Sequence, residues 1–173
     1  MTSTNSAYVD RLKSLLDTID QGSVDGVVLA IKTARTVFIA GNGGSDANAS
    51  HLALHLNEVG LRAHNLMAEI PLLTAYANDL AYDEVVRKRL RQSATPEDCL
   101  VVLRGSGNSR NIVLALAAAI NLGVKTVGIL GFGGGDSLAL CDVALVLASH
   151  EYGPVEDAHS AVIHLIQERL LDA

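Results

Sequence analysis

Apolar residues recur at helical spacing near the start of the chain, before any strand-like pattern begins. Val9, Leu12 and Leu16 belong to a first stretch, and Gln21-Gly22-Ser23 separates it from a second stretch that ends near Ala34. Spacings of three and four residues place apolar side chains on one face of a helix. We therefore expect an N-terminal helical segment over residues 1–34, followed by one domain over residues 35–173.

Short β-rich runs alternate with helical stretches through the rest of the chain. We expect strands at 36–40, 63–67, 100–103, 126–130 and 143–147, and helices at about 46–58, 110–119 and 155–171. The run at 63–67 is the weakest. Strands that alternate with helices imply right-handed βαβ units. The pattern predicts an α/β fold with a doubly wound, parallel, five-stranded sheet.

Composition supports a buried sheet and argues against two classes of partner. Apolar residues make up 49% of the 173 residues, but aromatic residues only 3%, so Ala, Val, Leu and Ile must build the core. Such residues are typical of strands covered on both faces. The net charge of −6 argues against a nucleic-acid surface, which needs clustered Lys and Arg. We interpret the basic run from Arg87 to Arg91 as the solvated face of a helix.

Cysteine content and the absence of a targeting pattern favour a soluble, cytoplasmic protein. Cys99 and Cys141 each lie near the start of an apolar run, as small buried thiols of a reducing compartment do. No apolar stretch reaches about 18 residues without a charge or a glycine, and the first ten residues carry no signal pattern. We expect no membrane partner.

Glycine-rich loops follow three of the predicted strands. The first two, 41–45 and 104–109, also carry the hydroxyl groups of Ser45, Ser106 and Ser109. The first loop lacks the lysine of a P-loop, and Asp46 stands where a dinucleotide motif needs a glycine. Glycines and free N–H groups at a helix start favour an anion. Two such loops in one sheet predict a phosphate monoester site, although each loop alone is also compatible with an ordinary turn or helix cap.

Histidines and one carboxylate on two predicted helices have metal-ligand spacing. His51 and His55 are four residues apart and share one helical face. Glu156 and His164 are eight apart, about 80° around a helix, whereas His159 points about 140° away from His164. These residue types suit zinc, but spacing alone does not show that the two helices meet. From spacing alone, a pair of satisfied or surface histidines is the better interpretation.

Taken in order, the motifs resemble those of one known family. They are Gly41-Asn42-Gly43-Gly44-Ser45, Ala49-x-His51, Asn78-Asp79, Ser106-Gly107-Asn108-Ser109, Cys141-Asp142-Val143, His159 and His164. The set is similar to the phosphoheptose (sedoheptulose 7-phosphate) isomerase branch of the sugar isomerase (SIS) domains, from about residue 35 to the end. The resemblance implies a flavodoxin-like core, a homotetramer, and active sites lined by more than one subunit.

The resemblance also implies roles for individual residues. The substrate-binding positions would be Asn42, Gly43, Gly44, Ser45, Asn78, Asp79, Ser106, Asn108 and Ser109. The zinc ligands would be His51, His55, Glu156 and His164. Taken alone, Asn78-Asp79 would be interpreted as a plain turn or helix cap.

Five residues depart from the family pattern. The family's catalytic glutamate is His55 here, its glutamine is Glu156, its Ser-Thr pair is Arg104-Gly105, and its aspartate three residues before the glutamine is Gly153. The site thus loses one carboxylate and gains another. Arg104 adds a substrate-binding cation beside the phosphate, or else fills the space of a substrate hydroxyl.

The function that these features favour is aldose–ketose isomerisation of a phosphorylated sugar, from sedoheptulose 7-phosphate to a heptose 7-phosphate through an enediolate. The reaction needs a base at carbon and a group that holds negative charge on oxygen. We assign Glu156 or His55 as the base, His164 as the complementary acid, and His51 as a ligand or positioning group. Two alternatives stay open: a non-catalytic SIS regulator of the type that associates with a replication initiator, and an isomerase for another long-chain sugar phosphate.

Overall fold

The chain forms an α/β fold around one parallel sheet. The computed structural model describes residues 4–106 and 108–172. The strands are β1 (Val37–Ala40), β2 (Ala63–Asn65), β3 (Cys99–Arg104), β4 (Lys125–Leu130) and β5 (Val143–Val146), and their order in the sheet is β2-β1-β3-β4-β5. All four pairings are parallel. This is the flavodoxin-like order, so the predicted fold class and all five predicted strands are confirmed.

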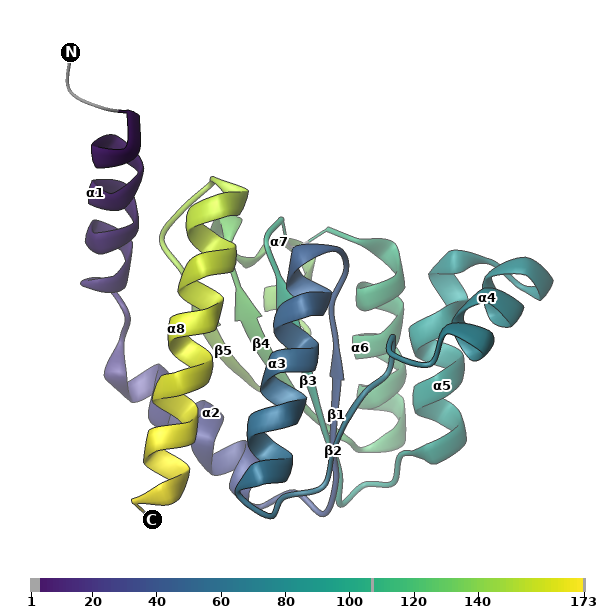
Figure 1. Ribbon diagram of the computed structural model, residues 1–173. Helices are drawn as coiled ribbons and strands as arrows, with labels where there is room; N and C mark the ends of the chain where they lie inside the picture. Colours follow the sequence, from purple (N-terminus) through teal and green to yellow (C-terminus); the bar gives the residue numbers. More distant parts are fainter. Residues whose placement is uncertain (1–3, 107, 173) are drawn as a thin grey trace.

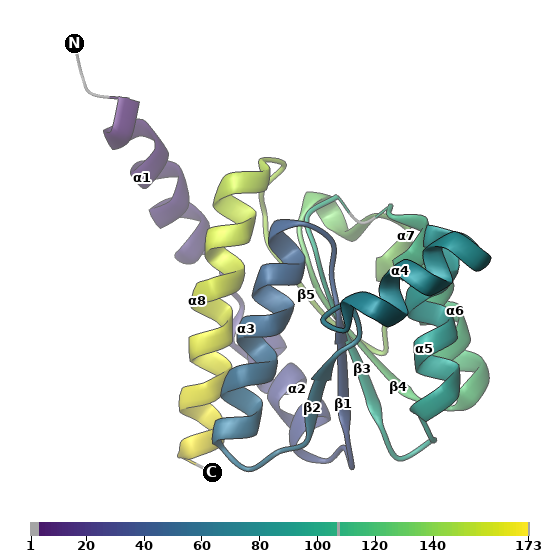
Figure 2. The same cartoon turned by 45° about the vertical axis from the view of Figure 1, so that its right-hand side comes forward.

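Helices cover both faces of the sheet (Figures 1 and 2). The α-helices are α1 (Thr4–Leu16), α2 (Gln21–Lys32), α3 (Gly44–Glu58), α4 (Ile70–Asp79), α5 (Val85–Ser93), α6 (Arg110–Leu122), α7 (Gly135–Leu138) and α8 (Tyr152–Leu171). Two short 3-10 turns, η1 (Tyr82–Glu84) and η2 (Phe132–Gly134), complete the set.

Successive residues of a strand pack into two separate cores, one on each face of the sheet. Val101 and Leu103 of β3 pack in the core beneath α2, α3 and α8, whereas Leu100 and Val102 pack in the core beneath α5 and α6. Every residue of β3 is buried. A strand with two buried faces reads as a continuous apolar run, because successive side chains point to opposite sides.

The N-terminal helices pack on the same core as α8. Val24, Val27 and Ile31 of α2 are fully buried in the core that α3 and α8 share, and Asp20 caps α2 by accepting a bond from the Ser23 N–H. Helix α1 extends away from the sheet and contacts α8 (Figure 1). Helix α2 has no core separate from that of α3 and α8. The predicted boundary at residue 35 stays a prediction.

Helix α4 was not predicted from the sequence, and α5 only through its basic run. No residue of α4 is fully buried, although Leu73, Tyr76 and Ala77 pack partly buried against the core beneath α5 and α6. Helix α5 buries Val85, Val86 and Leu90. Lys88 and Arg91 of the basic run are exposed, as the solvated-face interpretation requires, but the Arg89 guanidinium is largely buried, donates to the Leu66 carbonyl and pairs with Glu69. Both cysteines are free thiols, and none of the helices described is long and apolar enough to span a membrane.

Sheet topology places two of the glycine loops together. The chain leaves β1 toward the β2 edge and later returns to β3 on the other side of β1. Open parallel sheets bind ligands beyond the carboxyl ends of the strands at such a reversal. The loops after β1 and β3 are neighbours at this point.

Candidate active site

The two loops meet in one cavity of about 330 Å³. Its lining comes from three segments far apart in the sequence: the loop after β1, the loop after β3, and the first turn of α8. The lining residues are Asn42, Gly43, Gly44, Ser45, Leu103, Arg104, Gly105, Ser106, Ser109, Tyr152 and Glu156. Ser45, Ser106 and Ser109 therefore converge, as the phosphate interpretation requires.

The first loop owes its shape to glycine. A Cβ at Gly41 would collide with the backbone of Ser45, and Gly43 has a φ of +59°, which side chains disfavour. The loop turns directly into α3, where the Asp46 and Ala47 N–H groups bond to the Gly43 carbonyl. Ser45 lies buried in the first turn of α3. Backbone donors and a hydroxyl thus lie at a helix start, where an anion is favoured.

The second loop leads into α6 in the same way. Ser109 precedes α6 and its carbonyl accepts bonds from the Ile112 and Val113 N–H groups. Asn108 lies outside the cavity lining, and its Oδ1 accepts a bond from the Asp136 N–H at 3.1 Å. The predicted substrate role of Asn108 thus has no support in this arrangement, and Gly107 of the motif lies outside the described residues.

A polar network that the sequence did not reveal holds Asn42. The amides of Asn42 and Asn111 exchange two bonds of 2.9 Å, and the Tyr82 hydroxyl donates to Asn42 Oδ1 at 2.7 Å. Asn111 is buried in α6. Burial and the charge of Asp46 raise the pKa of Tyr82, which keeps its phenol protonated as a donor. Residues of α6 and η1 therefore position Asn42, and no motif near Asn42 in the sequence indicates this.

Helix α8 contributes a carboxylate and an aromatic ring to the cavity. The Glu156 carboxylate lies so close to Gly44 that a Cβ there would collide with it. The Tyr152 ring lies over Gly105, where a Cβ would come within 2.8 Å of the ring, and it packs on Phe132 with ring centroids 4.8 Å apart. Tyr152 was not predicted, because a single tyrosine before a helix has no distinguishing pattern.

Arg104 is a buried cation in the cavity wall. Its residue is only 3% exposed, and its Nη1 donates to Ser137 Oγ at 2.9 Å and to the Ser109 carbonyl at 3.3 Å. Burial lowers the pKa of Arg104 to about 10, so the guanidinium is charged at neutral pH. Among the residues that the structure describes, its Nη2 has no hydrogen-bond partner. Arg104 reaches the cavity, as its predicted substrate-binding role requires.

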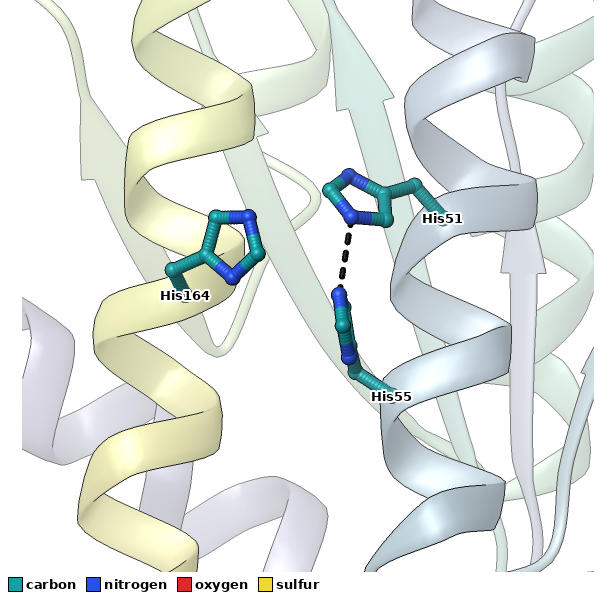
Figure 3. A group of neighbouring side chains, drawn as sticks. All are labelled: His51, His55 and His164. Atoms are coloured by element: carbon teal, nitrogen blue, oxygen red, sulfur yellow. Dashed lines mark hydrogen bonds between the residues drawn. The ribbon is translucent and has the colours of Figure 1, made fainter.

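Three histidines meet between α3 and α8 (Figure 3). His51, His55 and His164 each offer a ring nitrogen, and these atoms lie within 4.8 Å of one another. The Nε2 atoms of His51 and His55 are 2.8 Å apart. Burial, followed by the charges of His55 and His164, lowers the pKa of His51. The neutral form, which binds metals, is therefore favoured.

The cluster fits a divalent metal through three of the four predicted ligands. His55 also has a carboxylate neighbour, with Nδ1 2.9 Å from Glu58 Oε2, as metal-ligating histidines often do. Among the described residues, Glu156 is not a member of this group, because its carboxylate lies against Gly44. The contact between Glu58 and His55 was not predicted. The spacing of three residues between them, which places both on one helix face, could have indicated it.

The remaining predicted residues lie away from both groups. Asn78 and Asp79 are exposed at the end of α4, where the Asn78 amide bonds to the Asp79 carboxylate at 2.9 Å. His159 is fully buried on the sheet side of α8, which agrees with its exclusion from the metal set.

Comparison with known proteins identifies the family. The SIS domain model matches residues 4–131. The phosphoheptose isomerase of Syntrophotalea carbinolica is 32% identical over 94% of this chain and 90% of its own, and that of Nitratidesulfovibrio vulgaris is 38% identical over 81% and 70%. The structure of phosphoheptose isomerase from Neisseria gonorrhoeae matches with a TM-score of 0.92 and 26% identity, over 98% of this chain and 96% of that one. The chain therefore belongs to the SIS-domain family and, within it, to the phosphoheptose isomerases.

Proposed function

We propose that this protein interconverts sedoheptulose 7-phosphate and a heptose 7-phosphate by proton transfer through an enediolate. The observation that carries the proposal is the single cavity in which two serine-bearing loops meet the carboxylate of Glu156. A phosphate-binding end and a general base then lie within one site. The family relationship supports the same reaction class.

The phosphate end is built from backbone donors and hydroxyls. Ser45 at the start of α3 and Ser106 and Ser109 before α6 line the cavity together with Gly43 and Gly44. Both helices point their N-termini toward it, so N–H groups and helix dipoles favour a dianion there. These residues hold and orient the substrate and take no part in proton transfer.

Glu156 is the better candidate for the base. Its carboxylate lies in the cavity wall, whereas His55 lies outside the lining and interacts with His51 and Glu58. In the forward reaction Glu156 removes a proton from the carbon next to the carbonyl and returns it to the neighbouring carbon. His164, from the same face of α8, is the proposed acid: it protonates the carbonyl oxygen and takes up the proton that the neighbouring hydroxyl loses, so its own protonation state is restored.

A metal would be held by His51, His55 and His164. Three imidazole nitrogens are a donor set that zinc accepts. A bound divalent ion supplies Lewis-acid stabilisation of negative charge on a substrate oxygen. The proposed identity of the ion is zinc.

Assembly and location complete the proposal. We infer a cytoplasmic homotetramer in which a site completed by a neighbouring copy accounts for the exposed Asn78 and Asp79. The protein is proposed to act without nucleic acid or membrane partners. Sedimentation or light scattering tests the tetramer, and a monomer that is fully active would contradict it.

The decisive experiment combines metal analysis with an isomerisation assay on sedoheptulose 7-phosphate. Turnover by the purified protein supports the enzyme, and its loss in Glu156→Gln and His55→Ala tests the two candidate bases separately. Full turnover by both variants would remove the assignment. Turnover of a different long-chain sugar phosphate in preference would identify a specialised isomerase, which the altered Arg104-Gly105 pair favours.

The non-catalytic alternative is supported by one observation. The family's catalytic glutamate position is His55, and its ring already contacts His51 and Glu58. Retained sugar phosphate binding without turnover, in the metal-loaded protein, would support a regulatory protein and contradict the isomerase.

A further inference from the structure

Arg104 has a charge that the protein itself leaves uncompensated. Its Nη1 is bonded to a hydroxyl and a carbonyl, both neutral, and no ion pair to Arg104 exists within residues 4–106 and 108–172. The other charged residue of the cavity lining, Glu156, lies against Gly44 of the opposite loop instead. Asp136 is the nearby acid that favours the charged form, without being an ion-pair partner.

A buried guanidinium without a counter-ion is unfavourable for the free protein. Taking a charge out of water is costly unless an opposite charge or a full set of hydrogen bonds replaces the solvent. Arg104 is 3% exposed and its Nη2 is unpaired, so the cost is only partly offset. A side chain that serves stability alone would be expected to have a carboxylate partner here.

The guanidinium of Arg104, a residue of the cavity lining, is nevertheless held in place by two hydrogen bonds. Ser137 of α7 is fully buried, and its Oγ accepts from Nη1 at 2.9 Å. The second Nη1 bond, to the Ser109 carbonyl, joins the guanidinium to the loop that leads into α6. Gly105, the next residue, leaves room for the Tyr152 ring that covers this part of the loop. The charge is thus fixed beside Ser109 and close to the start of α6.

We propose that Arg104 is the specificity-determining residue of the phosphate end, providing the fixed counter-charge for a phosphate monoester dianion, with Ser137 as its positioning residue. The proposal rests on the proposed function, because it assumes that the cavity binds a sugar phosphate. It adds an ionic contact to a site otherwise made of hydroxyls and backbone donors. The ligand supplies the charge that the free protein lacks.

Two opposite effects of one substitution test the proposal. In Arg104→Met, affinity for sedoheptulose 7-phosphate and for inorganic phosphate should fall about 10- to 100-fold, the loss expected for a charge-assisted hydrogen bond. Affinity for unphosphorylated sedoheptulose should not change. Without ligand, the variant should be as stable as the parent or more stable, because an uncompensated buried charge has been replaced by an apolar chain.

The matched control is Arg110→Met, which removes the same charge six residues later. Arg110 is 77% exposed, pairs with Asp83, and lies outside the cavity lining. Its phosphate affinity should remain within about twofold of the parent, since exposed pairs contribute little. Equal losses in both variants would mean that only net charge matters and would overturn the proposal.

The role of Ser137 is tested by a double-mutant cycle measured by titration calorimetry. Ser137→Ala should weaken phosphate binding about 3- to 10-fold, but it should have no further effect in the Arg104→Met background. Additive losses would show that Ser137 does not act through Arg104. If Arg104→Met fails to fold, Arg104→Lys and Ser137→Ala still decide: unchanged phosphate affinity in both would contradict the proposal.

The outcomes also separate this inference from the proposed function. Turnover of sedoheptulose 7-phosphate by the parent, with unchanged phosphate affinity in Arg104→Met, would remove the inference and leave the isomerase intact. If the parent binds inorganic phosphate through Arg104 but neither binds nor converts the sugar phosphate, the proposed function fails and the anion site remains.

Discussion

The loop cavity and the histidine cluster are two parts of one candidate site that are built in different ways. The cavity is formed by glycines, backbone groups and buried polar side chains at the ends of β1 and β3. The cluster is formed by three imidazoles on α3 and α8, with His164 exposed. The sheet fixes the two loops of the cavity, whereas the cluster, like the position of Glu156 in the cavity wall, depends on how α8 packs against α3.

This difference bears on the predicted departures from the family pattern: His55 lies in the cluster, whereas Glu156 and Arg104-Gly105 lie in the cavity lining. In the cluster, a single side-chain exchange at His55 changes the donor set without affecting the backbone. In the first loop, Gly41 and Gly43 are constrained by contact and by φ, so sequence change is costly there. Side chains at the interface between α3 and α8 can therefore change while the first loop keeps its shape.

The largest expected effect concerns the carboxylate that belongs to the cavity. Glu156→Gln should lower kcat about 10³-fold with little change in sugar phosphate affinity, because a general base is lost and the loops are not altered. Steady-state kinetics with calorimetry measure both quantities. Asp157→Asn is the control, since Asp157 is exposed, lies outside the cavity lining and accepts a bond from the Tyr8 hydroxyl. Near-normal turnover in Glu156→Gln would assign the base to the cluster instead.

The next prediction isolates the cluster. His51→Ala should weaken Zn²⁺ binding by about 100-fold or more, and Glu58→Gln by about 10-fold, because partners of ligating histidines are themselves worth 10- to 100-fold. Zn²⁺ titration monitors binding independently of activity. His150→Ala removes a histidine outside the cluster and should leave the affinity unchanged. Unchanged affinity in His51→Ala would mean that the cluster is not a metal site.

A third prediction concerns the histidine of α8 that lies in the core, not in the cluster between α3 and α8. His159 is fully buried on α8, and burial lowers its pKa to about 4, against a smaller opposing effect of the Ile129 backbone. Because the pKa of His159 is lower in the folded state, the unfolded chain binds a proton at this imidazole at a higher pH than the folded protein does. Stability is therefore complete above about pH 6.5 and falls by about 3 kcal/mol as the pH drops toward 4.

Urea unfolding at a series of pH values measures this loss. His159→Leu should flatten the stability profile between pH 6.5 and 4, whereas His150→Leu, at an exposed position, should not. A parent profile that is already flat would contradict the buried neutral imidazole.

The smallest expected effect tests the rigidity of the first loop. Gly41→Ala should destabilise the protein by about 2 kcal/mol, because the added methyl group collides with the Ser45 backbone. In Gly22→Ala the new Cβ meets Asp20 Oδ2 at 3.4 Å, an ordinary contact, so that variant should be as stable as the parent or slightly more stable. Equal stabilities for the two variants would show that the loop adapts.

The sequence predicted the sheet well because each strand carries its own local signal. All five β-rich runs became strands, and the loops after the first and third supplied the cavity. Helix α4 was not predicted, although Leu73, Tyr76 and Ala77 have helical spacing and pack partly buried against the core beneath α5 and α6. Asn78 and Asp79 at its end are exposed, and their predicted substrate role stays a prediction.

Residue spacing fixed which side chains share a helix face, but not what each one touches. His51 and His55 had to be neighbours on α3, and Glu156 and His164 had to share a face of α8. Only the packing of α3 against α8 decided that His164 joins the histidines while Glu156 lies against Gly44. Likewise, the pairing of Arg104 with Ser137 joins residues 33 positions apart. Local periodicity is set by backbone geometry, whereas such contacts depend on where the sheet places each helix.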